Sequence, residues 1–124
     1  MEVRFREEAE PFTTLDGSTI RVLLDAVAGG AANQSLAEAE LGPGQQTRRH
    51  YHARTEEIYV LLDGGGEMEV EGDRAAVGSG DAVLIPAGAR HQIRAGEDGA
   101  RFLCCCAPPY SDGDTFFDEE IVPQ

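Results

Sequence analysis

Apolar and polar residues alternate along many short runs of the chain. In the segment GEMEVEG, Met68 and Val70 alternate with Glu67, Glu69 and Glu71, as expected for a strand with one buried face and one solvent-exposed face. Gly, Pro, Asp and Asn separate such runs at the spacing of a β-sandwich or barrel. The pattern therefore predicts an all-β protein of antiparallel strands.

The predicted strands are residues 3–6, 19–26, 35–41, 46–52, 58–62, 67–71, 75–77, 82–85, 90–95 and 101–107. Glycine, which adopts positive φ without steric cost, marks predicted turns at 16–17, 63–66, 72–73 and 78–80. Residues 35–41, SLAEAEL, have a helix-favouring composition, but their strict alternation is compatible with a strand, and we predict a strand there.

The length of 124 residues suits a single domain, because two domains of half this size would each have too small a core. We expect a core barrel at about residues 19–107 and an N-terminal strand within residues 1–12. The acidic tail, residues 108–124, is expected to be irregular, with Phe116 and Phe117 anchoring it to the barrel.

The charge of the chain limits its partners. With 10 basic and 23 acidic residues the net charge is −13, which disfavours nucleic acid and anionic membranes as partners and leaves a small-molecule substrate. No apolar run approaches the roughly 20 residues needed to cross a bilayer. The N-terminal sequence MEVRFREEAE lacks the apolar segment of a secretory signal, so a cytoplasmic location is expected.

The three cysteines are consecutive, Cys104, Cys105 and Cys106. Neighbours on an extended chain point to opposite faces, which excludes a disulfide framework within the chain. Cys104 and Cys106 share one face of the predicted strand and could serve a metal or a redox pair. The alternative, which we favour, is that all three are small apolar residues of a buried strand.

Two of the three histidines lie in the segment HYHARTEE, residues 50–57. His50 and His52 occupy positions i and i+2 of a predicted strand, so their side chains share a face with Cα atoms about 6.6 Å apart and can converge on one ion. If Glu57 faces inward at the start of the next strand, together with Tyr59 and Leu61, Glu56 is left at the turn. We therefore select Glu57 as the acidic partner of the two histidines.

The third histidine, His91, follows a sharp Pro-Gly turn in GDAVLIPAGARH and opens a predicted strand. The two histidine segments together resemble the two motifs of the cupin superfamily. The first motif is matched by Gly44, His50, His52, Glu57 and Gly64, and the second by Gly80, Pro86, Gly88 and His91. Ala95 stands where the second motif usually ends in asparagine, a residue that is not a ligand in the family.

This resemblance implies a double-stranded β-helix, the jelly-roll barrel of cupins. It also implies one divalent transition metal, Mn, Fe, Ni, Zn, Co or Cu, held by His50, His52, Glu57 and His91. Such a ligand set suits an octahedral ion with two open positions for water or substrate. Compact cupins commonly pair, and small sandwiches have sheet edges to protect, so we expect a homodimer in which residues 3–6 pair with the other subunit.

Two further residues are candidates for contact with substrate. Arg48 shares the predicted inward face with the histidines and is expected to contact a carboxylate or phosphate of the substrate; a surface ion pair is the equally weighted alternative. Tyr59 could offer its hydroxyl to substrate or to a metal-bound water, or could simply fill the core.

These residues predict a metal-dependent enzyme that acts on a small polar or anionic metabolite. Isomerisation or epimerisation and dioxygenation both suit the ligand set, and the sequence does not choose between them. The alternative from another class is a cupin that binds or senses a small molecule without turnover. A single barrel hosts many chemistries, so the fold itself does not decide the reaction.

Overall fold

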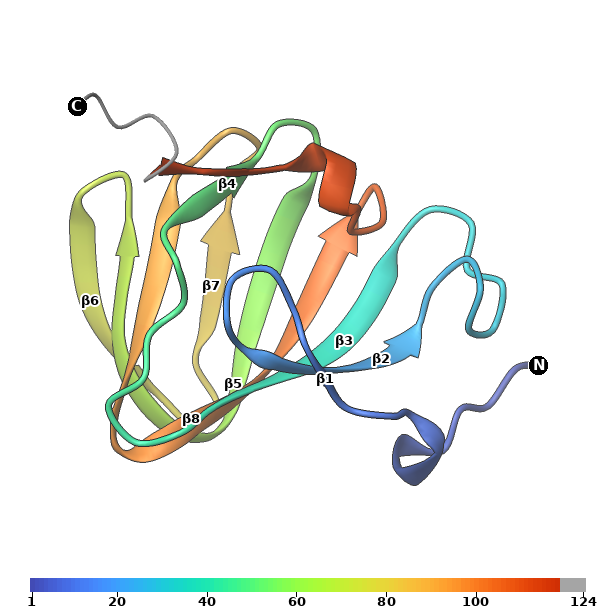
Figure 1. The fold of residues 1–124 in the computed structure, drawn as a ribbon, viewed down its shortest axis with the longest axis horizontal. Helices are drawn as coiled ribbons and strands as arrows, with labels where there is room; N and C mark the ends of the chain where they lie inside the picture. The colour runs from blue at the N-terminus through green and yellow to red at the C-terminus, as the bar shows by residue number, and fades with distance from the viewer. Residues whose placement is uncertain (119–124) are drawn as a thin grey trace.

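A computed structural model describes residues 1–118, which form nine strands and two short 3₁₀ helices (Figure 1). The elements are η1 Arg6–Glu8, β1 Phe12–Thr13, β2 Thr19–Leu24, β3 Ser35–Leu41, β4 His50–His52, β5 Glu56–Val70, β6 Asp73–Gly78, β7 Ala82–Ile85, β8 His91–Ala107, η2 Asp112–Asp114 and β9 Thr115–Phe117. No helix within this part of the chain has the length and apolar character needed to cross a membrane.

Two long strands, β5 and β8, organise the sheet. The second half of β8 pairs with β3 on one side and with the first half of β5 on the other, while its first half pairs with the second half of β5 and with β4. All of these pairings are antiparallel. β6 and β7 join the sheet through β5, β9 joins it through β4, and β2 and then β1 extend it from β3. The sheet curls on itself into a barrel (Figure 1), and the predicted all-β class is confirmed.

The glycine-rich segment 63–66 is a bend within β5 and not the predicted turn. Two register shifts interrupt its pairing with β8, and Gly64 has a φ of 67°. A Cβ atom on Gly66 would lie 1.9 Å from the carbonyl oxygen of Arg94 on β8, so only glycine allows the two strands to approach this closely. The predicted strands at 58–62 and 67–71 are therefore one strand, and those at 90–95 and 101–107 likewise join as β8.

Several predicted strands agree with the structure. Residues 35–41 and 82–85 form β3 and β7 with the same bounds, so alternation overrides the helical composition of SLAEAEL. The prediction for residues 46–52 was too long, because the strand begins only at His50 and Gln46 makes a single bridge to Arg94.

The predicted N-terminal strand at residues 3–6 was wrong. The segment runs into η1, and the Arg6 guanidinium reaches across to β3, where its Nε and Nη2 donate to the two carboxylate oxygens of Glu38 at 2.9 and 2.8 Å. An ion pair with a buried carboxylate thus fixes the segment in place of a strand ladder. The expected homodimer stays a prediction. Residues 3–6 form no strand that could pair with another subunit.

The tail is more regular than expected. Residues 112–117 form η2 and β9, and β9 pairs with β4. Phe117 is buried against the ring of His50, and Phe116 stacks on Tyr51 with ring centroids 5.3 Å apart, so the predicted anchoring by both phenylalanines is confirmed. The rest of the predicted tail, residues 119–124, lies outside the described residues.

The barrel interior away from the histidines is a continuous apolar core. Alternate residues of the long strands supply it, as their spacing of two along a strand requires. Its members are Ala39, Leu41, Tyr59, Leu61, Met68, Ile85, Ala89, Ile93, Ala95, Ala100 and Phe102. This core holds β3, β5 and β8 rigidly behind the histidine-bearing end of the barrel.

The Gly66→Ala substitution is expected to destabilise the fold strongly, because the new Cβ would collide with the backbone of β8. We expect a loss of about 3 kcal/mol or more in the free energy of unfolding, measured by urea denaturation. Gly78→Ala is the matched control, since its Cβ would meet only an ordinary contact at 3.8 Å. Equal stability of the two variants would contradict the account of the bend.

Candidate metal centre

Strand pairing brings the three histidines together at one end of the barrel. His50 on β4 lies directly opposite His91, the first residue of β8, and His52 is on the same face of β4 two residues later. All three are buried, and so is Glu57, whereas Glu56 is exposed. The assignment of Glu57, Tyr59 and Leu61 to the inward face is therefore confirmed.

The ligand atoms of these side chains converge. One nitrogen from each of His50, His52 and His91 can be chosen so that all lie within 4.8 Å of one another. Glu57 Oε1 lies 3.2 Å from His52 Nε2 and 3.6 Å from His91 Nε2, so the carboxylate completes one side of the group. The structure thus brings together all four predicted metal ligands, with Glu57 nearest to two of the histidines.

The outer nitrogen of each imidazole has an acceptor that fixes the tautomer. Nδ1 of His50 lies 2.7 Å from the Arg48 carbonyl oxygen, and Nδ1 of His91 lies 3.0 Å from that of Ala89. Because a carbonyl only accepts, both Nδ1 atoms must carry the proton. Each Nε2 then keeps its lone pair for the centre of the group.

The same holds for His52. Its Nδ1 lies 3.1 Å from Oγ1 of Thr115, and this hydroxyl already donates its hydrogen to the Ser111 carbonyl at 2.9 Å. The threonine oxygen is left as an acceptor, so His52 donates from Nδ1. Three imidazoles are consequently oriented in the way that histidine ligands of metals are.

Two buried atoms of the group have no hydrogen-bond partner among the described residues, Glu57 Oε1 and His91 Nε2. Unpaired buried polar atoms are costly, and native proteins satisfy nearly all of them. A carboxylate oxygen and imidazole lone pairs that face one point are the donor set of a divalent transition metal. The residues present therefore fit such an ion, held by His50, His52, His91 and Glu57.

The ionisation of the group agrees with cation binding. Burial, reinforced by the nearby charges of His91 and His52, lowers the pKa of His50 to about 4, so its imidazole is neutral at pH 7. Burial by itself raises the pKa of Glu57, but protonation of the facing imidazoles of His52 and His91 would supply hydrogen bonds and positive charge that outweigh it, and the pKa falls to about 2. A neutral imidazole and an ionised carboxylate are both ready to bind a metal.

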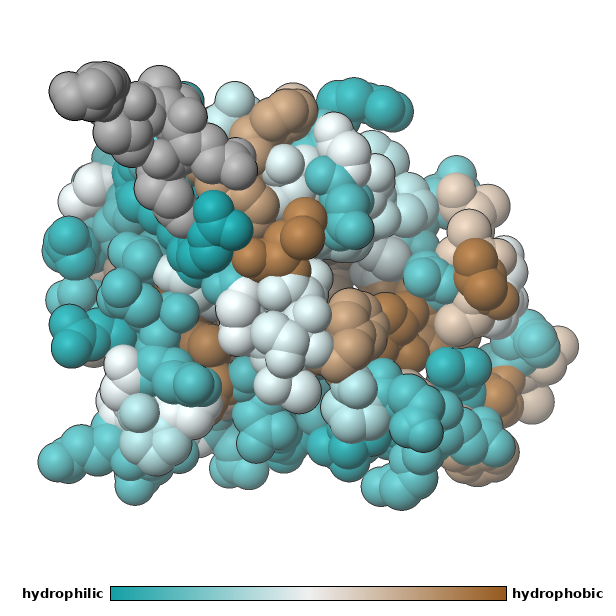
Figure 2. Space-filling view, in the orientation of Figure 1, coloured by the Kyte–Doolittle hydropathy of each residue, from teal (hydrophilic) through white to brown (hydrophobic). Residues whose placement is uncertain are grey.

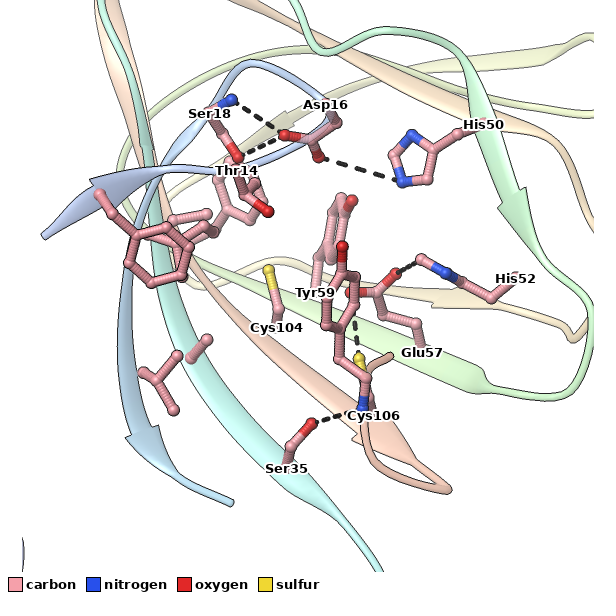
Figure 3. A pocket seen from close by; sticks show the side chains of 17 residues that line it. Thr14, Asp16, Ser18, Ser35, His50, His52, Glu57, Tyr59, Cys104 and Cys106 are labelled. Atoms are coloured by element: carbon pink, nitrogen blue, oxygen red, sulfur yellow. Dashed lines mark hydrogen bonds and ion pairs between the residues drawn. The ribbon is translucent and has the colours of Figure 1, made fainter. Parts of the chain in front are cut away.

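A cavity opens beside the histidines (Figure 3). Its inner wall holds His50, His52, Glu57, Tyr59, Cys104 and Cys106. The rest of its lining is mainly apolar, with Phe12, Ile20, Val22, Ala37, Ala39 and Phe102. Figure 2 shows hydrophobic surface where β1 and β2 cross this face, bordered by hydrophilic surface. A mainly apolar lining with a few convergent polar groups suits a small organic molecule.

Sequence reasoning missed Asp16, which reaches the cavity from the turn between β1 and β2 (Figure 3). Its Oδ1 accepts hydrogen bonds from the backbone N–H and the hydroxyl of Ser18, at 2.9 and 2.6 Å. Its Oδ2 faces Nε2 of His50 at 3.9 Å. The only sequence signal is the Asp-Gly pair, which marks the turn and says nothing of the cavity that it borders.

The two predicted substrate residues have different positions. Tyr59 lines the cavity, and burial, followed by the charge of Glu57, raises the pKa of its phenol well above the ordinary value. Its hydroxyl thus stays protonated. Arg48 does not share the inward face as expected: it is exposed, and its guanidinium lies over the ring of Phe117, 3.9 Å from the centroid. The parity argument failed because β4 begins after Arg48.

The three cysteines are free and buried or partly buried, which agrees with small apolar residues of a buried strand. Cys104 and Cys106 share a face and line the cavity, as the alternation predicted. Burial raises the pKa of both thiols, so they remain uncharged. The Cys106 thiol donates to Oε2 of Glu57 at 3.3 Å, which leaves Oε1 as the oxygen that faces the histidines.

The Glu57→Gln variant is expected to bind divalent metal at least about 10-fold more weakly than the wild type, because it loses a negative charge in the ligand set. Calorimetric titration of the metal-free protein with Zn²⁺ or Ni²⁺ measures this change. Glu56→Gln is the matched control, as it makes the same change at an exposed neighbouring position. Equal affinities of the two variants would remove Glu57 from the site.

The metal-free protein is expected to lose stability as the pH falls from 6.5 to 4. In this window the unfolded chain protonates His50 while the folded chain, with its pKa lowered to about 4, does not. At pH 4.5 this lowers the free energy of unfolding by roughly 2 kcal/mol relative to pH 7. Urea denaturation of the wild type and His50→Asn at pH 7 and pH 4.5 measures it. The account fails if both proteins lose stability equally.

Comparison with known proteins agrees with this geometry. The chain is 40% identical over 110 residues to an uncharacterised protein of Methanocaldococcus jannaschii, covering 88% of both chains. It is 35% identical over 82 residues to the dimethylsulfoniopropionate lyase DddW of Ruegeria pomeroyi, covering 66% of this chain and about half, 53%, of the lyase.

A solved structure and a family model complete the comparison. The polyketide cyclase RemF from Streptomyces resistomycificus superposes with a TM-score of 0.76 at 26% identity, over 92% of this chain and 89% of that one. The sequence model of the cupin domain matches residues 37–106, which include all four converging side chains. The chain belongs to the cupin family.

Proposed function

We propose that the protein is a divalent-metal-dependent enzyme that carries out isomerase or lyase chemistry on a small organic molecule bound in the barrel cavity. The observation that carries the proposal is the convergence of three oriented imidazoles and the Glu57 carboxylate, with unpaired buried atoms, at a cavity. A purely structural role would not need buried polar atoms left without partners.

A divalent metal at this position would polarise an oxygen of the bound molecule and stabilise negative charge that develops there. The chain supplies the remaining contacts. Tyr59, which stays protonated, is a hydrogen-bond donor in the cavity, and Asp16 is an acceptor held in place by Ser18. The apolar side chains of the lining would exclude water from a bound molecule, which would strengthen both contacts.

The similarity to a protein named as a lyase and to one named as a polyketide cyclase supports lyase or isomerase chemistry. Dioxygenation is the second candidate, because a set of three histidines and one carboxylate also suits iron. A cupin that binds a ligand without turnover is the alternative from outside enzymes. These three functions differ in metal content, oxygen use and exchange of substrate hydrogens.

The untagged protein is expected to contain about one divalent transition metal per chain by elemental analysis. After loading with Mn²⁺, Zn²⁺, Ni²⁺ or Fe²⁺, it is incubated in D₂O with small carbonyl and hydroxy-carbonyl compounds under anaerobic conditions. We expect proton NMR to show deuterium at carbon next to the carbonyl for at least one compound, abolished in His91→Ala. Turnover that requires O₂ with iron would instead support the dioxygenase. Metal without any turnover would support the binding protein.

A further inference from the structure

We propose that the cavity selects neutral or cationic, largely apolar molecules and rejects anionic ones, and that Asp16 is the residue that sets this selectivity. The inference rests on the proposed function only in taking the barrel cavity as the substrate site. It assigns to the site a class of ligand opposite to the carboxylates and phosphates expected from the arginines near the histidines.

Among the carboxylate, arginine and lysine side chains of the described residues, only negative ones line the cavity. Asp16 and Glu57 both line it, whereas the described residues, 1–118, place no arginine or lysine in its wall. Arg48, the expected anion-binding residue, has its guanidinium over Phe117. Arg49 and Arg90 are likewise engaged outside the cavity, by Glu69 and by Asp118. An anion that enters the cavity therefore meets negative charge without a basic side chain to offset it.

The two carboxylates have different tasks. Glu57 is committed to the metal group, with Oε2 accepting from Cys106 and Oε1 facing His52 and His91. Asp16 is the carboxylate that remains for the bound molecule, since its Oδ2 points across the cavity toward His50 from 3.9 Å (Figure 3).

Hydrogen bonds fix the position of the Asp16 carboxylate. Oδ1 accepts two hydrogen bonds from Ser18, a residue with only 1% of its surface exposed. The turn itself is closed by hydrogen bonds from the Thr14 N–H to the Ser18 carbonyl and from the Gly17 N–H to the Thr14 carbonyl, both at 3.0 Å. The Asp16 carbonyl also accepts from the Arg48 N–H at 2.8 Å. The carboxylate is thus a fixed element of the cavity wall.

The rest of the wall defines the shape and polarity of the ligand. Phe12, Ile20, Val22 and Phe102 give the cavity a large apolar surface. The remaining polar groups, among them Thr14 and Ser35, are uncharged. Planar, mostly apolar molecules with a hydrogen-bond donor directed at Asp16 match this lining, because the donor satisfies the carboxylate while the ring covers the apolar wall.

A fixed charge in a partly enclosed cavity has a large effect on ligand affinity. Two like charges about 5 Å apart repel enough, at an effective dielectric of about 20, to weaken binding by roughly 200-fold, and by less where water screens the pair. Benzamidine, benzamide and benzoate test this directly, because they have nearly the same size and shape and carry charges of +1, 0 and −1.

The three compounds are titrated into the full-length, metal-free protein at pH 8 and followed by calorimetry or ligand-observed NMR. Without metal, no direct bond between benzoate and an ion obscures the effect of charge. For the wild type we expect benzoate to bind at least about 10-fold more weakly than benzamide, and benzamidine to bind at least as well as benzamide. In Asp16→Asn the penalty for benzoate should fall to below about 3-fold.

Two further variants isolate the role of Asp16. Asp16→Glu keeps the charge and should keep the rejection of benzoate. Asp98→Asn removes one negative charge from an exposed position outside the cavity and should behave as the wild type. Asn can still accept the Ser18 hydrogen bonds through its amide oxygen, and circular dichroism checks that each variant is folded.

The inference is overturned if wild-type protein binds benzoate as well as benzamide, if Asp16→Asn leaves the penalty unchanged, or if Asp98→Asn removes it equally. Failure of all three compounds to bind at millimolar concentration would also overturn it. None of these outcomes bears on the metal proposal, which is tested by elemental analysis and by metal titration of Glu57→Gln. Conversely, a protein without metal could still show the selectivity for charge.

Discussion

The close approach of β5 and β8 at their glycine-rich bends is the constraint on which the rest of the structure depends. These strands pair along two separate stretches, and the bend between them turns a flat sheet into a barrel. Gly66 has no Cβ to collide with β8, which lets both strands bend together. The second stretch then carries His91 to a position beside His50, so the geometry of the site follows from backbone packing about 25 residues away along the chain.

The four side chains of the metal group are energetically unfavourable in a protein interior. Three imidazoles and a carboxylate lie within a few ångströms, and two of their atoms have no partner among the described residues. Such an arrangement costs stability unless a cation compensates it. Around it, every orienting contact is satisfied, from the Arg48 and Ala89 carbonyls to the Thr115 hydroxyl. The unfavourable part is confined to the atoms that would face a metal, as expected for a site kept for function.

Local patterns in the sequence predicted the strands, the four converging side chains and the choice of Glu57 over Glu56, because alternation and i, i+2 spacing report directly which face a residue occupies. They could not predict features that depend on distant partners. Gly64 and Gly66 look like turn residues until β8 is placed against them. Asp16 borders the cavity only because β1 and β2 fold across its mouth. Tail residues become a strand only because β4 offers them a free edge.

The pairing of β9 with β4 affects when the site can form during synthesis of the chain. β9 lies along β4 and covers its full length, Phe117 packs on His50, and Thr115 fixes the tautomer of His52. Asp114 also accepts from the backbone N–H groups of Arg54 and Thr55, in the loop that leads to Glu57. During synthesis on the ribosome, the histidines of β4 are therefore translated long before the segment that orders them. The site reaches its final form only after residue 117 has emerged.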